Sequence, residues 1–501
     1  MIGWERMARI RVDLDRAIGR VDERIFGGFI EHLGRCIYGG IYEEGSPLSD
    51  ARGFRTDVLE AVKQLRVPVL RWPGGNFVSG YHWTDGIGPV DERPRRRELA
   101  WHTVESNRFG TDEFIAYCRE IDTEPYICVN MGTGTIDEAA NWVEYCNGTG
   151  DTYWANLRRQ NGHPEPYNVT YWGLGNEMYG GWQIGALSAD DYVKKAREFA
   201  KVMRWTDPSI ELIGCGHSGY SDWDRVVLAG LAPFVRYHAI HIYTGSDDFH
   251  RNVFAPHQAE RALRICQGLI DQARFNGKIE HDITVAYDEW NVWFRARSWD
   301  TALEERYTLS DALAVATYLN IFVRACRTVG MANLAQLVNV IAPIFTSPEG
   351  LFRQAIFHPL RLLVERTQPI ALDAWVESPA TTLEPEPPHT PEVNRIADLG
   401  PFDLIDVAAT RDEGRSRLTL SIVNRSPDEV MPTTIELSQA LPKQTGAVFE
   451  VNAATVDAAN SFEQPDAVSV REWSVDVEGD RMALDVPPHA HVVMTVDLVG
   501  R

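Results

Sequence analysis

Cysteine is scarce in this chain. Seven cysteines occur among 501 residues, an odd number, and no two of them form a C-x-x-C pair. Most lie within apolar runs typical of helices or strands. We therefore expect buried, reduced thiols rather than a disulfide framework.

Long apolar runs are also missing. No apolar stretch comes near the length of about 18 residues that would span a bilayer. The first segment, MIGWERMARIRVDLD, lacks the apolar h-region of a signal peptide. These features predict a cytoplasmic protein without a membrane partner.

Basic blocks are absent, and acidic residues prevail. The chain has 49 Lys and Arg against 71 Asp and Glu, a formal net charge of −22. A polyanion such as nucleic acid is therefore not an expected partner. A neutral or cationic partner fits the charge, and so does acidity that only aids solubility.

The chain does contain a regular alternation of short apolar runs and amphipathic segments. The amphipathic segments show the i, i+3, i+4 spacing of helices, and several follow Ser, Thr or Asp. About eight such repeats favour a (β/α)₈ TIM barrel. A doubly wound sheet is the alternative, but no G-x-G-x-x-G follows the first strand. The predicted strands lie at 24–34, 67–75, 124–132, 168–177, 210–216, 235–243, 283–290 and 331–341.

The pattern changes after about residue 372. A Pro/Thr/Glu-rich connection at 378–393 precedes runs of period-2 alternation, which predict an antiparallel, jelly-roll-like β-sandwich. The strand-like run ARIRVDLD, residues 8–15, precedes the barrel and is expected to join the sandwich. We place the barrel at 18–375 and the sandwich at 1–17 and 376–501.

Two glutamates stand at the ends of predicted barrel strands, where barrel chemistry lies. Glu177 ends the fourth strand after Asn176, and Glu289 ends the seventh. Both are followed by aromatic residues. Two carboxylates on one cavity, with separated pKa values, suit cleavage of a glycosidic bond. For either glutamate alone, an ion pair with Arg or Lys at the barrel rim is as good an explanation as a catalytic role. For the two together, the ion-pair explanation is poor.

Five segments of the chain resemble the family 51 α-L-arabinofuranosidases. This family belongs to the clan of retaining (β/α)₈ glycoside hydrolases that carry catalytic glutamates after strands four and seven. The resemblance runs from the first strand through the C-terminal sandwich. The segments VNMGTG and RQAIFHP differ mildly from the family's usual sequence. These differences concern the fit of the substrate and not the reaction. The motifs are GGFIEHLGRCIYGGIYE (27–43), LRWPGGNFVSGYHW (70–83), WGLGNEMYGGWQ (172–183), DEWNVW (288–293) and NVIAPIF (339–345).

The resemblance implies that Glu177 is the general acid/base and Glu289 the nucleophile of a retaining reaction. We expect the charge of Glu289 to raise the pKa of Glu177, so that the acid arrives protonated. Retention requires the two carboxyls to lie roughly 5–5.5 Å apart, whereas inversion needs roughly 6.5–9.5 Å.

Further residues match positions that contact the sugar in that family. Tyr243 would hydrogen-bond near the nucleophile and Arg71 would hold Glu289 ionised, although Arg71 also fits an ordinary ion pair. Asn76 fits equally well as a turn residue, and Trp182, Trp293 and Trp299 fit as rim packing. By resemblance, the sugar contacts are Glu31, Asn76, Asn176 and Gln354, with Trp101 as an aromatic wall.

His238 and His241 invite a metal interpretation. Their i, i+3 spacing on a strand points them to opposite faces, so they are poor joint ligands. His241 shares a face with Tyr243 and is expected to support the site. We predict no metal and no cofactor.

The resemblance implies exo-acting hydrolysis of terminal non-reducing α-L-arabinofuranosyl residues. Short arabino- or arabinoxylo-oligosaccharides are the expected substrates, and the resemblance implies a homo-hexamer. Two alternatives are open: a β-xylosidase or endo-β-1,4-glucanase of the same clan, and a non-catalytic carbohydrate-binding protein. Loops at 244–258 and 291–308 are expected to set linkage preference.

Overall fold

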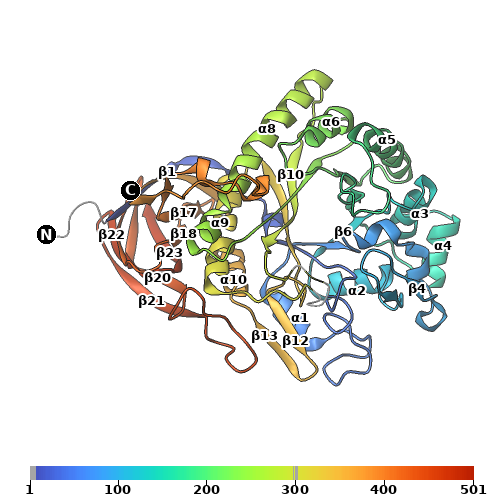
Figure 1. Ribbon diagram of the computed structural model, residues 1–501, viewed down its shortest axis with the longest axis horizontal. Helices are drawn as coiled ribbons and strands as arrows, with labels where there is room; N and C mark the ends of the chain where they lie inside the picture. The colour runs from blue at the N-terminus through green and yellow to red at the C-terminus, as the bar shows by residue number, and fades with distance from the viewer. Residues whose placement is uncertain (1–6, 297, 299–302, 501) are drawn as a thin grey trace.

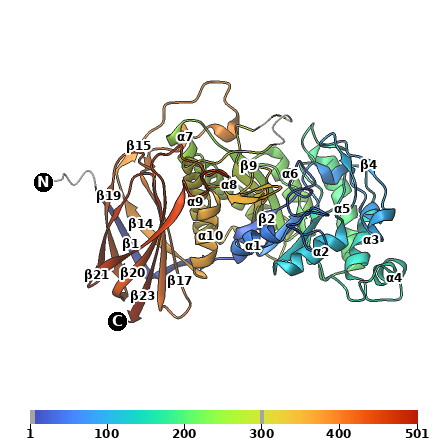
Figure 2. The same ribbon diagram turned by 90° about the horizontal axis from the view of Figure 1, so that it is seen from below.

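The computed structural model describes residues 7–296, 298 and 303–500. Figures 1 and 2 show two parts side by side, a barrel ringed by helices and a second closed sheet. The first and last strands of the described chain, β1 (Ala8–Arg20) and β23 (His491–Gly500), both belong to the second sheet. Trp299 and part of the 291–308 loop lie outside the described residues.

The first part is a closed barrel of parallel strands, as predicted. Each of the eight predicted segments contributes one strand, and the strands follow chain order around the barrel until β11 pairs with β2. Their residues are almost all buried because helices cover the outside. The strands are β2 (Gly27–Phe29), β3 (Val69–Trp72), β6 (Glu124–Cys128), β7 (Tyr171–Leu174), β8 (Glu211–Gly214), β9 (Tyr237–Thr244), β10 (Thr284–Val292) and β11 (Val329–Ala335).

The helices form where the sequence has helical apolar spacing and a cap. Thr135, Ser188 and Ser221 each accept a backbone N–H of the first turn that follows them. The helices are α1 (Thr56–Gln64), α2 (Thr111–Glu120), α3 (Ile136–Asn147), α4 (Tyr153–Gln160), α5 (Ala189–Thr206), α6 (Asp222–Leu231), α7 (Phe249–Phe254), α8 (His257–Gly277), α9 (Leu309–Arg324) and α10 (Phe357–Arg366).

Helices α9 and α10 lie between the two parts (Figure 1). Residues 309–323 of α9 are all buried, because the helix contacts β10 of the barrel on one side and the second sheet on the other. A helix that is buried all round needs apolar residues all round, and ALAVATYLNIF supplies them.

The second part is the predicted antiparallel sheet with two differences. Strand β1 enters it as expected, between β14 and β19, but its pairing with β19 is parallel, and the sheet closes on itself. Strand β14 starts at Ile370, within the range 18–375 that we assigned to the barrel. It belongs to the second sheet because it pairs with β1 and β17. Its strands are β1 (Ala8–Arg20), β14 (Ile370–Glu377), β17 (Ile405–Arg411), β18 (Arg417–Asn424), β19 (Met431–Ser438), β20 (Ala440–Asn452), β21 (Ser469–Glu478), β22 (Arg481–Val486) and β23 (His491–Gly500).

Three antiparallel two-stranded sheets lie outside the two closed sheets of the described chain. They are β4 (Arg96–Arg97) with β5 (Val104–Glu105), β12 (Ile344–Ser347) with β13 (Gly350–Arg353), and β15 (Ala380–Thr381) with β16 (Phe402–Asp403).

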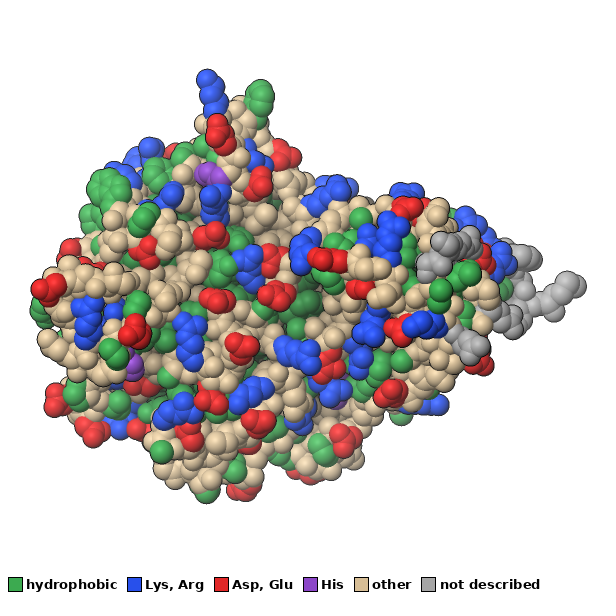
Figure 3. All heavy atoms as spheres, turned by 180° about the vertical axis from the view of Figure 1, so that it is seen from behind, with side chains coloured by type: hydrophobic (Ala, Val, Ile, Leu, Met, Phe, Trp, Pro, Cys, Tyr) green, Lys and Arg blue, Asp and Glu red, His purple; other side chains and the backbone are tan. Residues whose placement is uncertain are grey.

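Several predictions from composition can be compared with this fold. All seven cysteines are buried and free, which confirms the predicted thiols. No helix within the described residues is both long and apolar enough to pass through a bilayer. On the face seen in Figure 3, acidic and basic side chains are interspersed, so its described residues form no block of one sign.

Candidate active site

A pocket of about 410 Å³ opens at the carboxyl ends of the barrel strands. A larger cavity, about 830 Å³, lies at the opposite end of the barrel, where Arg24 pairs with Asp22. Barrel chemistry occurs at the carboxyl ends, so the smaller pocket is the candidate site. Predicted residues in its wall are Glu31, Asn76, Trp101, Glu177, Tyr243 and Glu289, together with Trp182 and Trp293.

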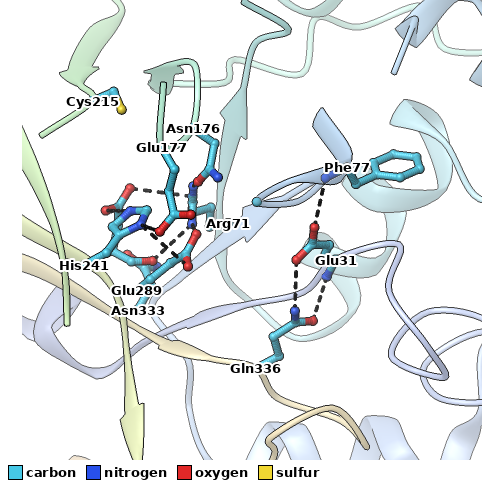
Figure 4. Close-up of polar contacts among 12 residues, drawn as sticks. Glu31, Arg71, Phe77, Asn176, Glu177, Cys215, His241, Glu289, Asn333 and Gln336 are labelled. Carbon is cyan, nitrogen blue, oxygen red and sulfur yellow. Dashed lines mark hydrogen bonds and ion pairs between the residues drawn. The ribbon is translucent and has the colours of Figure 1, made fainter. Parts of the chain in front are cut away.

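The two glutamates predicted from the sequence meet in this pocket (Figure 4). One carboxylate oxygen of Glu177 and one of Glu289 lie within 4.8 Å of each other. Gly175, with φ +76°, and Glu177, with φ +42°, turn the chain sharply after β7, and glycine takes that conformation without strain. The glycine-rich motif therefore serves to bring Glu177 over the barrel.

Arg71 and Tyr243 hold Glu289. Arg71 Nη1 donates to Glu289 Oε1 at 2.6 Å, and the Tyr243 hydroxyl donates to Oε2 at 2.8 Å. The other end of the guanidinium, Nη2, donates to Asn176 Oδ1 at 2.6 Å. Arg71, Asn176 and Glu289 are all buried, so these charge-assisted bonds fix the carboxylate in one orientation.

Glu177 accepts three hydrogen bonds. The donors are His241 Nδ1 at 3.0 Å, Trp182 Nε1 at 2.7 Å and the Tyr179 hydroxyl at 3.1 Å. Burial alone would raise the pKa of Glu177, but these hydrogen bonds and the charge of His241 hold it below its ordinary value. The net pKa of Glu177 thus lies below its ordinary value, opposite to the expectation that the acid rests protonated, because the donors around Glu177 and the charge of His241 outweigh burial.

Asp288 is a site residue that the sequence did not reveal. Its Oδ1 lies 3.0 Å from His241 Nε2, and its Oδ2 accepts from the Tyr126 hydroxyl at 2.8 Å. Strand alternation should point Asp288 away from Glu289. An irregularity in the pairing of β10 with β9, between Ala286 and Glu289, brings both carboxylates to one region.

Glu31 lies on the other side of the pocket. Its carboxylate accepts from the Phe77 backbone at 3.1 Å, from Trp101 Nε1 at 2.9 Å and from Gln336 Nε2 at 3.1 Å. Burial, with a smaller contribution from the charge of Glu289, raises its pKa to about 8 despite these donors. Gln336 also accepts the Glu31 N–H at 3.0 Å, and no sequence motif pointed to this residue.

Gln354 is not brought to the pocket. Its Nε2 donates to Glu305 O and Ala342 O, and its Oε1 accepts from Tyr307 N. The amide is thus occupied by backbone, and it ties β13 to the segments around 305 and 342. The proposed sugar contact at Gln354 has no support from this geometry.

The two histidines on β9 behave as their spacing predicted. His238 lies 2.9 Å from Asp224, whereas His241 faces the carboxylates. Among the described residues, Glu177, His241 and Glu289 bring ligand atoms close enough to suit a cation. Arg71 already neutralises Glu289, however, and the nearby carboxylates keep His241 protonated, so the group is arranged for hydrogen bonding.

Two protein-family models match the chain. The first, described as alpha-L-arabinofuranosidase 1 domain, matches residues 61–261, and the second, alpha-L-arabinofuranosidase C-terminal domain, matches residues 288–490.

Individual proteins are similar over most of the chain. Alpha-L-arabinofuranosidase C of Emericella nidulans is 47% identical over 79% of this chain and 83% of its own. Intracellular exo-alpha-(1->5)-L-arabinofuranosidase 1 of Bacillus subtilis is 38% identical over 96% and 97%. The solved GH51 alpha-L-arabinofuranosidase from Thermotoga petrophila RKU-1 aligns with a TM-score of 0.90 and 42% identity over 98% and 100%.

Proposed function

The chain belongs to the α-L-arabinofuranosidases of glycoside hydrolase family 51, and on that basis we propose a retaining mechanism in which Glu289 is the nucleophile and Glu177 the acid/base. The proximity of the two carboxylates carries this proposal. A separation within 4.8 Å between their nearest oxygens fits retention, because inversion needs room for a water molecule.

The two roles follow from the contacts of each glutamate. Arg71 and Tyr243 fix Glu289, as in-line attack on the anomeric carbon requires. Glu177 lies beside the exposed Trp182, where the leaving group would depart. Glu177 gives its proton to the leaving oxygen while Glu289 forms an ester with the sugar. It then takes a proton from the water that hydrolyses this ester.

The substrate and the setting form part of the same proposal. The Bacillus subtilis relative is described as an intracellular exo-enzyme for α-(1→5) linkages. A pocket of about 410 Å³ suits a terminal sugar better than the middle of a polymer. We therefore favour exo-action on short arabino- or arabinoxylo-oligosaccharides in the cytoplasm. The homo-hexamer implied by resemblance stays a prediction, which native mass would test.

The test is a pair of alanine variants assayed with aryl α-L-arabinofuranosides. Glu289→Ala should lose at least about 10³-fold in kcat, with azide restoring turnover through an arabinosyl azide product. Glu177→Ala should slow release of phenoxide far more than release of dinitrophenoxide, which leaves without a proton. Normal turnover by Glu289→Ala would reject the nucleophile, and equal slowing of both substrates by Glu177→Ala would reject the acid.

A panel of nitrophenyl glycosides tests the sugar preference. The arabinofuranoside should be cleaved far faster than the xyloside or the glucoside. A faster xyloside would favour the β-xylosidase alternative.

A further inference from the structure

His241 lies at the centre of the catalytic carboxylates. Its Nε2 is 3.0 Å from Asp288, and its Nδ1 is 3.0 Å from Glu177 and 3.6 Å from Glu289. His241 and Glu289 are also neighbours across β9 and β10. One ring therefore contacts three acidic groups, two of which carry the reaction proposed above.

The carboxylates determine where the protons lie. An ionised carboxylate only accepts hydrogen bonds, so a ring that faces one at each nitrogen must donate from both. His241 is then an imidazolium, and one of its protons points at Glu177. Burial opposes this charge, but Glu289 and Asp288 outweigh it and raise the pKa of His241 to about 10.

Groups from every neighbouring element contribute to this balance. Beyond the three carboxylates, Arg71, on β3, pairs with both Asp288 and Glu289 and reduces the negative charge around the ring. Burial lowers the pKa of His217, after β8, so this imidazole adds little positive charge. Tyr126, on β6, donates to Asp288 and stabilises its ionised form. The described neighbours thus leave His241 with more negative than positive charge around it.

This arrangement raises a question about the proposed acid. Glu177 needs a proton to protonate the leaving group, yet its surroundings favour the ionised form. The nearest mobile proton is the one on His241 Nδ1.

We propose that His241 holds the leaving-group proton in reserve and passes it to Glu177 as the glycosidic bond breaks, and that Asp288 is the positioning residue that keeps the ring in place for this transfer. The inference rests on the roles proposed for Glu177 and Glu289. It adds a proton store behind the acid.

The step balances without any further reactant. In the first half, the bond from the anomeric carbon to the leaving oxygen breaks, and the bond to Glu289 forms. The leaving oxygen takes a proton from Glu177, which takes one from His241 Nδ1. Because Glu289 loses its charge in the ester, the main attraction for the proton on His241 weakens at the moment of transfer.

The second half reverses the transfer. Water attacks the anomeric carbon, its proton goes to Glu177, and the bond from the sugar to Glu289 breaks. The restored charge of Glu289 then draws the proton back to His241. The charge of the nucleophile thereby controls the proton of the acid through the ring that contacts both.

The first test uses the wild-type enzyme. Nitrogen NMR of the His241 ring should show both nitrogens protonated from pH 6 to 8. A ring that titrates to a neutral form below pH 7 would overturn the proposal.

The second test is Asp288→Asn, which removes one of the charges that hold the imidazolium. With phenyl α-L-arabinofuranoside, the basic limb of kcat/KM should move to lower pH by at least about one unit. With the dinitrophenyl substrate, glycosylation should change by less than threefold, because that leaving group needs no proton. Equal slowing of both substrates with an unmoved basic limb would mean that Asp288 only supports the fold.

Asp224→Asn is the matched control. Asp224 is also buried and lies 2.9 Å from a histidine of β9, His238. Its loss should leave the basic limb in place, even if it lowers the melting temperature. A similar shift in this variant would assign the effect to general loosening and overturn the proposal.

A third variant tests the same proposal if Asp288→Asn does not fold. His241→Asn keeps an N–H near Glu177 but cannot release a proton, so phenyl arabinofuranoside turnover should fall far more than dinitrophenyl turnover. A failure of the roles proposed for Glu177 and Glu289 is detected separately. In that case Glu177→Ala would slow the phenyl and dinitrophenyl substrates equally.

Discussion

Glu31 is a buried carboxyl that binds its proton more tightly in the folded chain than in the unfolded chain. Its pKa rises from 4.5 to about 8 on folding. Between these values the folded state holds a proton that the unfolded state releases. The contribution of Glu31 to stability therefore falls as pH rises across that window, by up to about 1.4 kcal/mol per pH unit.

Glu31→Gln should remove this slope. We expect urea unfolding between pH 5 and 8 to show a flatter dependence of the free energy of unfolding in the variant than in the wild type. Glu165→Gln, at an exposed position, is the control and should leave the slope unchanged. The same flattening in both variants would contradict the assignment.

Gln354 provides a second prediction at the residue scale. Because its amide binds backbone at three points, Gln354→Ala should lower the free energy of unfolding by about 1–3 kcal/mol with little change in KM. Asn76→Ala, in the pocket wall, should raise KM with little loss of stability. A raised KM without loss of stability at Gln354 would restore the sugar contact implied by the resemblance.

These residues mark the limit of sequence reasoning at this scale. Glu177 and Glu289 were predictable because strand ends and aromatic neighbours signal them. Asp288 was not, because a pairing irregularity in β10 overrides the alternation that the sequence implies. Gln354 matched a family motif, but a motif does not give the direction of a side chain.

At the scale of elements, the loops after β3, β6 and β7 meet at Gly132. A Cβ built there would lie 2.4 Å from Ser79 O and 2.7 Å from Ile184 O. Ser79 Oγ also accepts from Gln183 Nε2 at 2.6 Å, which links this contact to the loop that carries Glu177. Only a glycine allows the three loops to pack this closely.

Gly132→Ala should therefore separate the loops. We expect it to lower the free energy of unfolding by about 1–3 kcal/mol and kcat/KM by at least about tenfold. Gly181→Ala is the control, since a Cβ there meets nothing within 4 Å. Urea unfolding and aryl arabinofuranoside assays of both variants decide the matter, and indistinguishable variants would refute the role of Gly132.

The elements themselves were largely predictable. Apolar runs located all eight barrel strands, because a covered parallel strand must be apolar on both faces. The closure of the second sheet was not predictable, since alternation along β1 and β19 is the same whether they pair in parallel or antiparallel fashion.

At the scale of the whole molecule, an ion pair between the buried Asp406 and the half-buried Arg324 joins the barrel helix α9 to the second sheet. Asp406, on β17, lies 3.0 Å from Arg324 and accepts from Asn320 at 2.8 Å. Burial disfavours its charge, but Arg324 and Arg425 hold its pKa far below the ordinary value. Removing the charge of Asp406 is costly, because the fully buried Arg425 then keeps its charge without this compensation.

Asp406→Asn should lower the free energy of unfolding at pH 7 by about 3–5 kcal/mol. The folded pKa of Asp406 is depressed, so its contribution is present above about pH 4 and is lost as the pH falls below that value. Wild type and variant should therefore converge in acid. The control is Asp373→Asn, which removes an exposed partner of Arg16 and should cost less than about 1 kcal/mol. Equal costs in urea unfolding, or parallel acid limbs, would show that this ion pair does not stabilise the junction between the two parts.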